Sequence, residues 1–330
     1  MKTFNDKPQH KRLWSAALLL LSACITPALA QDFPPKKPVS LVVGFAAGGA
    51  ADTAARLIAK KLSENIGQSV IVDNRAGAGG NIAHAYVANA ATDGSVLLFG
   101  SVGPLTIAPH LMKLSYDPVR DLAPITMGVN FPNVLVVHAG VKVKTLAEFV
   151  ALAKKKPGSL DFASTGPGSA SHLAGELFNV QAGVDTVHIP YKGGAPAMQD
   201  LLGERVAAYY STPSTAAPFI ESGKLIALAT TGLTRPAFMP NVPTIAESGY
   251  PGFNATNWYA FVGPAKTPKV ILDRWNLELV KVLNAPDVRE QLLKPGLTPM
   301  PGTRDELARY MASESTTWGR VIKDRKITAE

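Results

Sequence analysis

Residues 39–61, which read VSLVVGFAAGGAADTAARLIAKK, predict a strand, a glycine-rich turn and a helix in immediate succession. The first five residues are nearly all apolar and show no polar alternation, which is typical of a strand buried on both faces. Gly44, Gly48 and Gly49 allow a sharp turn and a close approach of the backbone to a small ligand. The following helix points its unbonded N–H groups at the same place, so the segment predicts an anion site. Asp52, in the first helical turn, is favoured by the helix dipole, and we interpret it as a capping residue.

The same unit recurs twice in the next fifty residues. Strands are predicted at residues 69–73 and 96–99, and small-residue turns follow them at residues 74–81 and 100–104. Strands that alternate with helices predict a parallel sheet with right-handed crossovers. All three turns then lie at the carboxyl edge of one sheet, where open α/β sheets bind ligands.

A second block of the chain, residues 133–230, repeats this order of elements. Its first helix is predicted to begin with a capping box in which Glu148 reaches back to Thr145. A strand at residues 257–262 then marks the return to the first block, and helices are predicted at residues 268–283, 287–293 and 303–323, the last packing on the first domain. Two similar α/β domains joined by two crossings predict a hinged clamp with its cleft between the sheets.

These crossings define the predicted domains. Domain 1 comprises residues 31–132 and 258–330, domain 2 comprises residues 133–257, and the ligand cleft lies between them.

Composition excludes several classes of protein. The chain has 330 residues, of which 46% are hydrophobic and 18% are charged, as expected for a globular protein. No apolar stretch approaches the roughly 20 residues that span a bilayer. The basic residues are scattered rather than clustered, so we expect no nucleic-acid partner. We also expect no cofactor.

The N-terminus, residues 1–30, has the features of a secretory signal peptide. Four basic residues precede a short apolar core, and Ala28 and Ala30 form a small-x-small cleavage site. We therefore expect a periplasmic protein that begins at Gln31. The alternative is cleavage before Cys24, which would leave a lipid-anchored protein. Removal of residues 1–30 leaves 29 basic and 24 acidic residues, a net charge of +5, and no cysteine for disulfides or thiolate metal sites.

Three catalytic or metal-binding interpretations are weak. Gly44 and Gly49 have the spacing of a phosphate loop, but Ala50 and Ala51 stand where Lys and Ser or Thr are required, which argues against nucleotide hydrolysis. Ser169 and His172 could act as nucleophile and base, but they lack a nucleophile-elbow pattern, and an N-cap serine is the favoured interpretation. His172 and Glu176 share a helix face, but no second histidine completes a zinc site, so no metal is expected.

Several motifs together carry a family resemblance. They are residues 43–52 with Arg56, residues 74–81, residues 92–94, residues 164–169 with His172, and residues 190–193. With these motifs the chain resembles, over essentially all of its mature length, the Bug-type periplasmic solute receptors of tripartite tricarboxylate transporters. One departure is Ala47, where the family often has a proline.

The resemblance implies a fold and a set of ligand-facing positions. The fold is a two-domain periplasmic-binding-protein (Venus flytrap, type II-like) α/β fold with mixed, mostly parallel sheets and two interdomain crossings. A small carboxylate would be held by backbone N–H groups, hydroxyls and bridging waters. The positions it places at the ligand are Phe45, Ala46, Ala47, Gly48, Gly49, Ala78, Gly79, Ser101, Ser164, Thr165, Gly166, Gly168, Ser169, His172 and Tyr191, to which we add Ser211, Thr212 and Asn257.

The residues themselves predict an anion-binding clamp. Together with the resemblance, they imply a non-catalytic, monomeric solute-binding protein that captures a small carboxylate for the membrane permease subunits of a tripartite transporter. Two alternatives remain open. One is a secreted hydrolase that uses Ser169 and His172, and the other is a ligand-sensing receptor for a membrane signalling protein.

Overall fold

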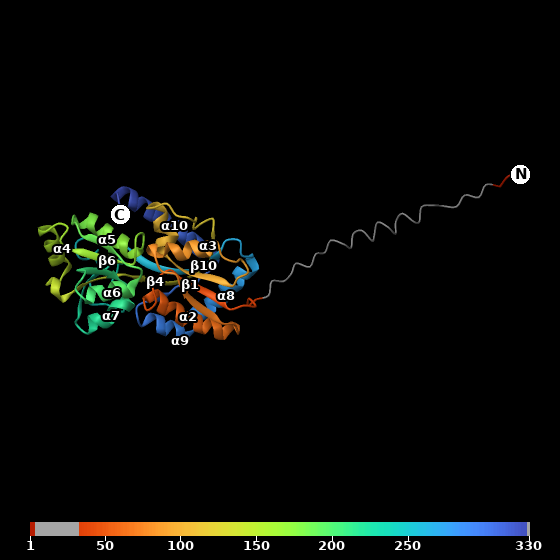
Figure 1. The fold of residues 1–330 in the computed structure, drawn as a ribbon, viewed down its shortest axis with the longest axis horizontal. Helices are drawn as coiled ribbons and strands as arrows, with labels where there is room; N and C mark the ends of the chain where they lie inside the picture. Colours follow the sequence, from red (N-terminus) through yellow and green to blue (C-terminus); the bar gives the residue numbers. More distant parts are fainter. Residues whose placement is uncertain (4–32, 329–330) are drawn as a thin grey trace. The chain divides into compact units, whose positions relative to one another are not determined.

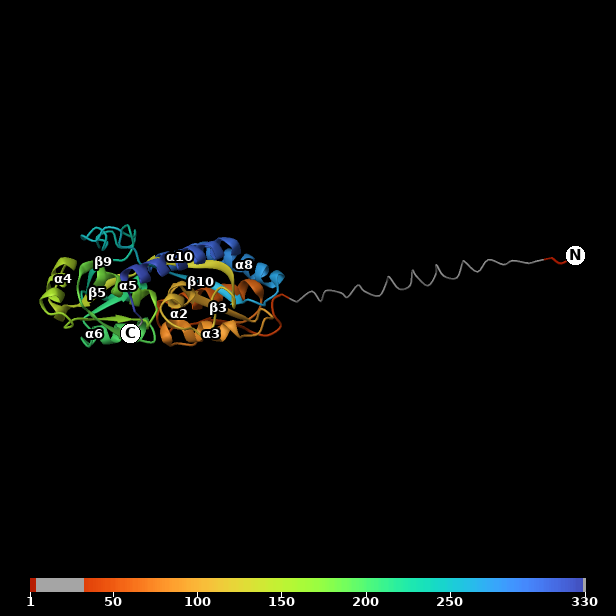
Figure 2. The same ribbon diagram turned by 90° about the horizontal axis from the view of Figure 1, so that it is seen from above.

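The computed structural model describes residues 1–3 and 33–328, and it shows an α/β fold with two mixed sheets (Figures 1 and 2). All of the described helices and strands belong to one unit, Phe33–Glu330. The predicted signal peptide, its cleavage site and Cys24 lie outside the described residues.

The first sheet has the strand order β11-β4-β10-β3-β1-β2. β1 pairs in parallel with β2 and β3, as the recurring unit predicts, whereas β10, β4 and β11 continue the sheet in antiparallel pairs. Its strands are β1 (Val39–Val43), β2 (Val70–Asn74), β3 (Val96–Ser101), β4 (Leu122–Pro132), β10 (Thr256–Pro264) and β11 (Thr298–Pro299).

The second sheet has the order β7-β6-β8-β5-β9, with parallel pairs on the β7 side and antiparallel pairs on the β9 side. Its strands are β5 (Val134–His138), β6 (Asp161–Ser164), β7 (Val187–Pro190), β8 (Ala208–Ser211) and β9 (Leu225–Thr230). Among the named strands of the described chain, four pairings are parallel and five are antiparallel, so the sheets are mixed but not mostly parallel. The strands on either side of each crossing, β4, β5, β9 and β10, pair antiparallel with their neighbours. These pairings are why the sheets are less parallel than predicted.

β4 is the longest described strand and was not predicted. Pro124, Gly128, Asn130 and Pro132 interrupt its apolar pattern, and these are residues that usually weaken or end strands. Pairing with β10 along its whole length, with two register shifts, accommodates them.

Helices cover both faces of each sheet. Each sheet with its helices forms one lobe of the molecule. In the first lobe, which contains the first sheet, α2 and α8 pack with Val39, Leu41 and Val43 on one face, and α3 and α10 pack with Val42 on the other. These four β1 residues are fully buried, which confirms the prediction of a strand covered on both sides. α10 also packs along β4, as predicted. The helices are α2 (Ala50–Ile66), α3 (Asn81–Ala88), α8 (Lys269–Asn284), α9 (Pro286–Leu293) and α10 (Arg304–Arg325).

In the second lobe, α4 and α5 pack on one face of the sheet, and α6 and α7 pack on the other. Thr145 caps α4 by accepting from the backbone N–H of Glu148. The expected return bond is different, because the Glu148 carboxylate accepts from the N–H of Lys144 rather than of Thr145. The helices are α4 (Leu146–Lys155), α5 (Ala170–Ala182), α6 (Gly194–Leu202) and α7 (Pro213–Glu221), and α7 was not predicted.

The two crossings between the lobes are tied together. Asn133 separates β4 from β5, and residues 231–255 connect β9 to β10. Thr231 accepts from the N–H of Asn133 and donates to the carbonyl of Ala255 through one hydroxyl, with both distances 2.9 Å. This buried junction brings the two crossing segments side by side next to the cleft.

Candidate functional site

The turns of the two lobes meet through their backbones. The N–H of Ala46 donates to the carbonyl oxygen of Lys192 in the other lobe, at 3.1 Å. A Cβ added at Gly79 would lie 2.2 Å from the carbonyl oxygen of Pro167, which only a glycine permits, and Gly79 also has a φ of +64°. A Cβ at Gly103 would lie 2.6 Å from the carbonyl oxygen of Gly168. The small residues predicted at the cleft therefore allow the lobes to close tightly.

A small cavity of about 20 Å³ lies inside this contact. A volume of roughly 10–15 Å³ holds one water molecule, so a larger ligand requires the lobes to separate. None of the described residues that line the cavity carries a formal charge. The lining comprises Phe45, Ser101, Asn133, Thr165, Ala170, Ser171, Tyr209, Tyr210, Thr212, Asn257 and Tyr259.

Three buried polar atoms around the cavity have no hydrogen-bond partner among the described residues: Ser101 Oγ, Asn133 Nδ2 and Asn257 Oδ1. The two amides bond to each other, since Asn257 Nδ2 donates to Asn133 Oδ1 at 3.2 Å. Whichever way the amides are oriented, one such bond leaves one donor and one acceptor of the pair unused. Buried polar groups are normally satisfied, so this cluster is suited to a polar ligand.

The start of α5 also faces the cavity. Ser169 is the N-cap, and its Oγ accepts from the N–H of His172 at 3.3 Å, which confirms the capping interpretation. Ala170 and Ser171 occupy the first two helical positions and line the cavity. N–H groups at these positions have no acceptor within the helix, so they and the helix dipole favour an anion.

Other N–H groups that the sequence suggested for the ligand are bonded to side chains of their own lobe. Ser171 Oγ accepts from the N–H of Thr165, Ser164 Oγ accepts from Gly166, and His172 Nδ1 accepts from Gly168, at 2.9–3.2 Å. These bonds shape the turn before α5. Of the N–H groups around this turn, those in the first turn of α5 remain available to a ligand.

The first-lobe turn is held in a similar way. Asp52 accepts from the N–H of Gly48 at 3.0 Å and pairs with Arg56 at 2.8 Å. Burial raises the pKa of the Asp52 carboxyl, but the bonds from Arg56, Gly48 and Asn74 outweigh burial and hold it below its ordinary value. Asp52 therefore supports the turn as a charged carboxylate. The capping interpretation is wrong, because the N-cap of α2 is Gly49 and no side chain caps the helix.

Of the predicted site residues, five line the cavity: Phe45, Ser101, Thr165, Thr212 and Asn257. The others lie outside its lining. Tyr191 donates its hydroxyl to Asp200 at 2.8 Å, and Ser211 donates to the carbonyl of Thr212. The remaining residues of this group are Ala46, Ala47, Gly48, Gly49, Ala78, Gly79, Ser164, Gly166, Gly168, Ser169 and His172.

Sequence reasoning missed six of the lining residues. Ala170 and Ser171 could have been found, because they follow the N-cap and carry the free N–H groups of the helix. Asn133 and the tyrosines gave no comparable signal, because their position depends on the crossings and on alternation along buried strands. Burial raises the pKa of Tyr209 and Tyr259 above their ordinary value, so both present a neutral hydroxyl. The missed residues are Asn133, Ala170, Ser171, Tyr209, Tyr210 and Tyr259.

Ser169 and His172 do not form a nucleophile–base pair. The Ser169 hydroxyl bonds to the backbone N–H of His172, and the Nδ1 of the ring accepts from Gly168. A hydrolase needs the serine oxygen in contact with an imidazole nitrogen. The geometry therefore does not favour the hydrolase alternative.

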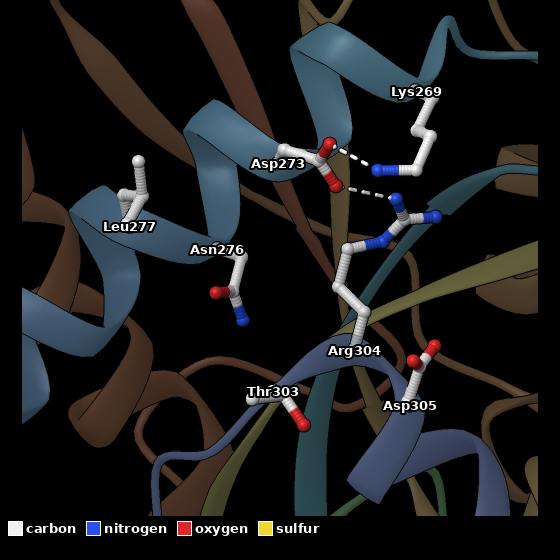
Figure 3. Close-up of a pocket in the computed structure, with 7 residues that line it drawn as sticks. All are labelled: Lys269, Asp273, Asn276, Leu277, Thr303, Arg304 and Asp305. Atoms are coloured by element: carbon white, nitrogen blue, oxygen red, sulfur yellow. Dashed lines mark hydrogen bonds and ion pairs between the residues drawn. The ribbon is translucent and has the colours of Figure 1, made fainter.

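A larger hollow of about 330 Å³ lies on the surface between α8 and the start of α10 (Figure 3). Its Asp273 is already paired with Lys269 at 2.6 Å and with Arg304 at 2.7 Å. It is open and removed from the contact between the lobes, so we do not regard it as the site.

Within the described residues, no cluster of three or more His, Cys, Asp or Glu side chains could hold a metal ion. No helix in this part of the chain combines the length and the apolar character needed to cross a bilayer.

Comparisons with known proteins agree with the fold. The model of the tripartite tricarboxylate transporter family receptor matches residues 54–327. Protein BugT of Bordetella pertussis is 37% identical over 309 residues, which cover 93% of this chain and 95% of BugT. The structure of R. palustris Rpa4515 with adipate has a TM-score of 0.86 and 34% identity, covering 90% of this chain and 99% of that one. MatC from Rhodopseudomonas palustris with bound malate has a TM-score of 0.84 and 32% identity, covering 87% and 99%.

Proposed function

Because the chain belongs to the tripartite tricarboxylate transporter receptor family, we propose that it captures a small carboxylate outside the cytoplasmic membrane and delivers it to the permease subunits of such a transporter. Adipate and malate, which occupy the similar structures Rpa4515 and MatC, belong to this class of ligand. The protein acts as a monomer and catalyses no reaction.

The observation that carries this proposal is the polar cavity at the start of α5. It combines the free N–H groups of Ala170 and Ser171 with the hydroxyl of Ser101 and the unused donor of the Asn133–Asn257 pair. These donors come from both lobes and from the crossings. A carboxylate bound there would be held by neutral groups and by the helix dipole, without a cationic partner.

Binding then follows from the motion of two domains. Domain 1 comprises residues 31–132 and 258–330, domain 2 comprises residues 133–257, and they separate to admit the ligand and close on it. The ligand contacts are the predicted positions other than Ser164 and His172, together with Asn133, Ala170 and Ser171. Ligand-dependent docking to a permease distinguishes transport from sensing, in which the closed form would instead bind a signalling protein.

We expect carboxylates to stabilise the protein and amines and sugars to have no effect. The described cavity lining has no carboxylate to meet an ammonium group, whereas N–H and hydroxyl donors are plentiful. A ligand at about 100 times its dissociation constant adds about 2.7 kcal/mol to the free energy of unfolding. A thermal-shift screen of di-, tri- and aromatic carboxylates, beginning with adipate and malate, tests this. Strong stabilisation by a sugar while every carboxylate fails would refute the proposal.

We expect the exported protein to begin at Gln31, because Ala28 and Ala30 provide the cleavage site. The intact mass of the protein recovered from the periplasm checks this. A mass that includes a diacylglyceryl group on Cys24 would show that the protein is membrane-anchored instead.

A further inference from the structure

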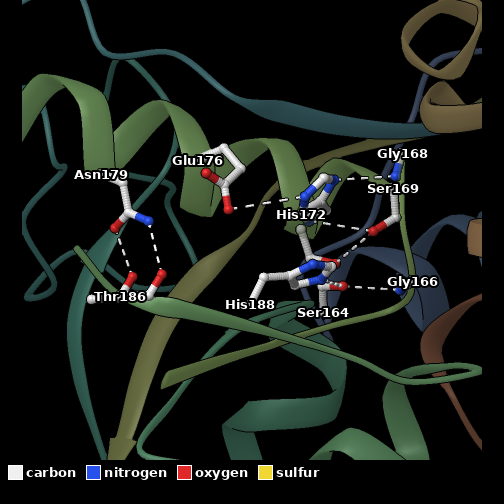
Figure 4. Close-up of polar contacts among 10 residues, drawn as sticks. Ser164, Gly166, Gly168, Ser169, His172, Glu176, Asn179, Thr186 and His188 are labelled. Carbon is white, nitrogen blue, oxygen red and sulfur yellow. Dashed lines mark hydrogen bonds and ion pairs between the residues drawn. The ribbon is translucent and has the colours of Figure 1, made fainter. Parts of the chain in front are cut away.

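The rings of a buried histidine, His172, and a half-buried one, His188, stack directly behind the turn that precedes α5 (Figure 4). The rings of His172, on α5, and His188, on β7, have centroids 4.1 Å apart and planes 29° apart. Phe162 of β6 stacks on the other side of His188, with a centroid distance of 5.2 Å. The result is a column of three rings across α5, β7 and β6, with His172 only 1% exposed.

Each histidine is linked to the turn of residues 165–168. His172 Nδ1 accepts from the backbone N–H of Gly168 at 3.2 Å. His188 Nε2 lies 2.5 Å from Ser164 Oγ, which in turn accepts from the N–H of Gly166 at 3.0 Å. This turn is the part of the second lobe that meets Gly79 and Gly103 of the first lobe. The two rings therefore fix the shape of a surface that must fit the opposite lobe.

We infer that His172 and His188 are positioning residues that hold the turn of residues 165–168 in its closing shape when both rings are neutral, and that acid releases the turn and weakens ligand binding. The part of this inference that concerns the ligand rests on the proposed function. The part that concerns the turn does not, because its bonds exist within one lobe.

The chemistry of the Gly168 bond requires a neutral ring. His172 Nδ1 is an acceptor there, so a proton on Nδ1 would face the N–H of Gly168 and the bond would be lost. Two protonated rings stacked at 4.1 Å would also repel each other. In agreement, burial, and secondly the neighbouring His188, lowers the pKa of His172 from 6.5 to about 3.

The charged and titratable groups around His172 do not offset this effect on its ring. On α5, Glu176 Oε1 lies 3.9 Å from His172 Nε2, and its charge would favour protonation, but burial dominates. On β8, burial and Glu176 raise the pKa of Tyr210 well above its ordinary value, so this group stays neutral in acid. On β6, Asp161 accepts from the N–H of Ala207. On β7, the titratable group is His188 itself.

The short contact between Ser164 and His188 supports the turn and is not that of a catalytic serine with its base. Ser164 is fully buried, and its Oγ already accepts from Gly166, so it is not available to a substrate. His188 lies between two rings and serves the same turn. The two histidines therefore act on the ligand only through the backbone that they hold.

The sign of the pH dependence follows from the pKa of His172. The released turn would return His172 towards its ordinary pKa of about 6.5 and would bind a proton more readily than the held turn. Release is therefore favoured as the pH falls below about 6.5. At pH 5, which is 1.5 units below that value, the equilibrium constant for release of the turn rises by up to about 30-fold.

Hydrogen exchange of the unliganded full-length mature protein tests this directly. We expect the protection of the amides of Thr165, Gly166 and Gly168, corrected for the intrinsic exchange rate, to fall by about 10- to 30-fold between pH 7.5 and pH 5. Residues 269–284, in α8 of the first lobe, serve as the internal reference and should change much less. Protection of the turn that does not depend on pH would overturn the inference.

Matched variants separate positioning from simple structural support. In His172→Asn/His188→Gln, carboxamides replace the titrating nitrogens with groups that can still hydrogen-bond, so protection at pH 7.5 should be kept while its loss at pH 5 is reduced to less than about threefold. His172→Leu removes the acceptor and should lower the protection of Gly168 about tenfold at both pH values. His110→Gln changes a surface histidine that bonds to Ser315 and is the control. A parent-like acid response in the double variant would also overturn the inference.

The affinity for adipate, measured by calorimetry at pH 7.5 and pH 5, extends the test to the ligand. Comparing the parent with the double variant cancels the protonation of adipate itself. The parent should lose about tenfold more affinity in acid than the double variant does. Equal losses would show that release of the turn does not reach the site. If adipate does not bind at all, the proposed ligand class is in question, while the exchange experiment still decides the role of the histidines.

Discussion

Ser169→Asp is expected to abolish carboxylate binding in a protein that still folds. Ser169 is the N-cap of α5, and the next two residues line the cavity. Aspartate is as good an N-cap as serine, so the helix should keep its start. The added charge also interacts favourably with the helix dipole, by about 0.3–1 kcal/mol, which opposes the cost of burying it.

The same charge would repel the ligand. Ser169 is 2% exposed in the closed protein, so solvent screens it poorly. At an effective dielectric constant near 20, two negative charges roughly 4 Å apart repel by about 4 kcal/mol. That corresponds to about a thousandfold loss of affinity.

Calorimetry with the best carboxylate from the thermal-shift screen measures this loss, and circular dichroism and thermal melting check the fold. Ser169→Asn is the matched control, because asparagine has the same shape and capping ability without the charge. We expect it to bind within about tenfold of the parent. Parent-like affinity in a folded Ser169→Asp protein would show that the start of α5 does not hold the ligand.

Gly103→Ala is expected to weaken binding by roughly 10- to 100-fold without lowering stability. A Cβ at Gly103 would lie 2.6 Å from the carbonyl oxygen of Gly168 and 3.0 Å from the Cα of Ser169, both in the other lobe. Its φ is not in the left-handed region, so alanine fits the first lobe without strain. Overpacking of a close contact costs about 1–3 kcal/mol. Because this contact forms between the lobes, the cost makes closure of the lobes on the ligand less favourable.

Melting of the unliganded variant and calorimetry with the same carboxylate separate the two effects. Gly263→Ala is the control in the same lobe, since its added Cβ would meet Leu272 and Ile125 at ordinary distances of 3.5 and 3.6 Å. It should leave the affinity unchanged. A Gly103→Ala protein that binds like the parent would show that the ligand is not held by this closed contact.

Local patterns predicted most of the elements and the caps. The unbroken apolar run of β1, the glycines after it and the N-cap Ser169 each depend on neighbours within a few residues, and the structure confirms all three. The turns predicted at the ligand do lie where the two lobes meet. These features follow from the backbone preferences of single residues and from the spacing of apolar residues, both of which can be seen in the sequence.

Tertiary structure decided the features whose partners are distant in the chain. β4 accommodates Pro124, Gly128 and Pro132 because β10 pairs along its whole length. Asn133 and Asn257, 124 residues apart, meet at the crossings between the lobes. No local rule predicts such a pair.

The N–H groups before α5 show most clearly what the sequence determined and what the tertiary structure decided. The sequence predicted a turn rich in free donors, and the turn is there. Ser171, Ser164 and His172 accept from its N–H groups, and His188 from the next strand completes the arrangement. The sequence alone thus determined where an anion site could form, because a glycine turn before a helix always leaves N–H groups unbonded by the helix. Which of them remain free was decided by packing, because a buried side chain that reaches a backbone donor satisfies it before any ligand can.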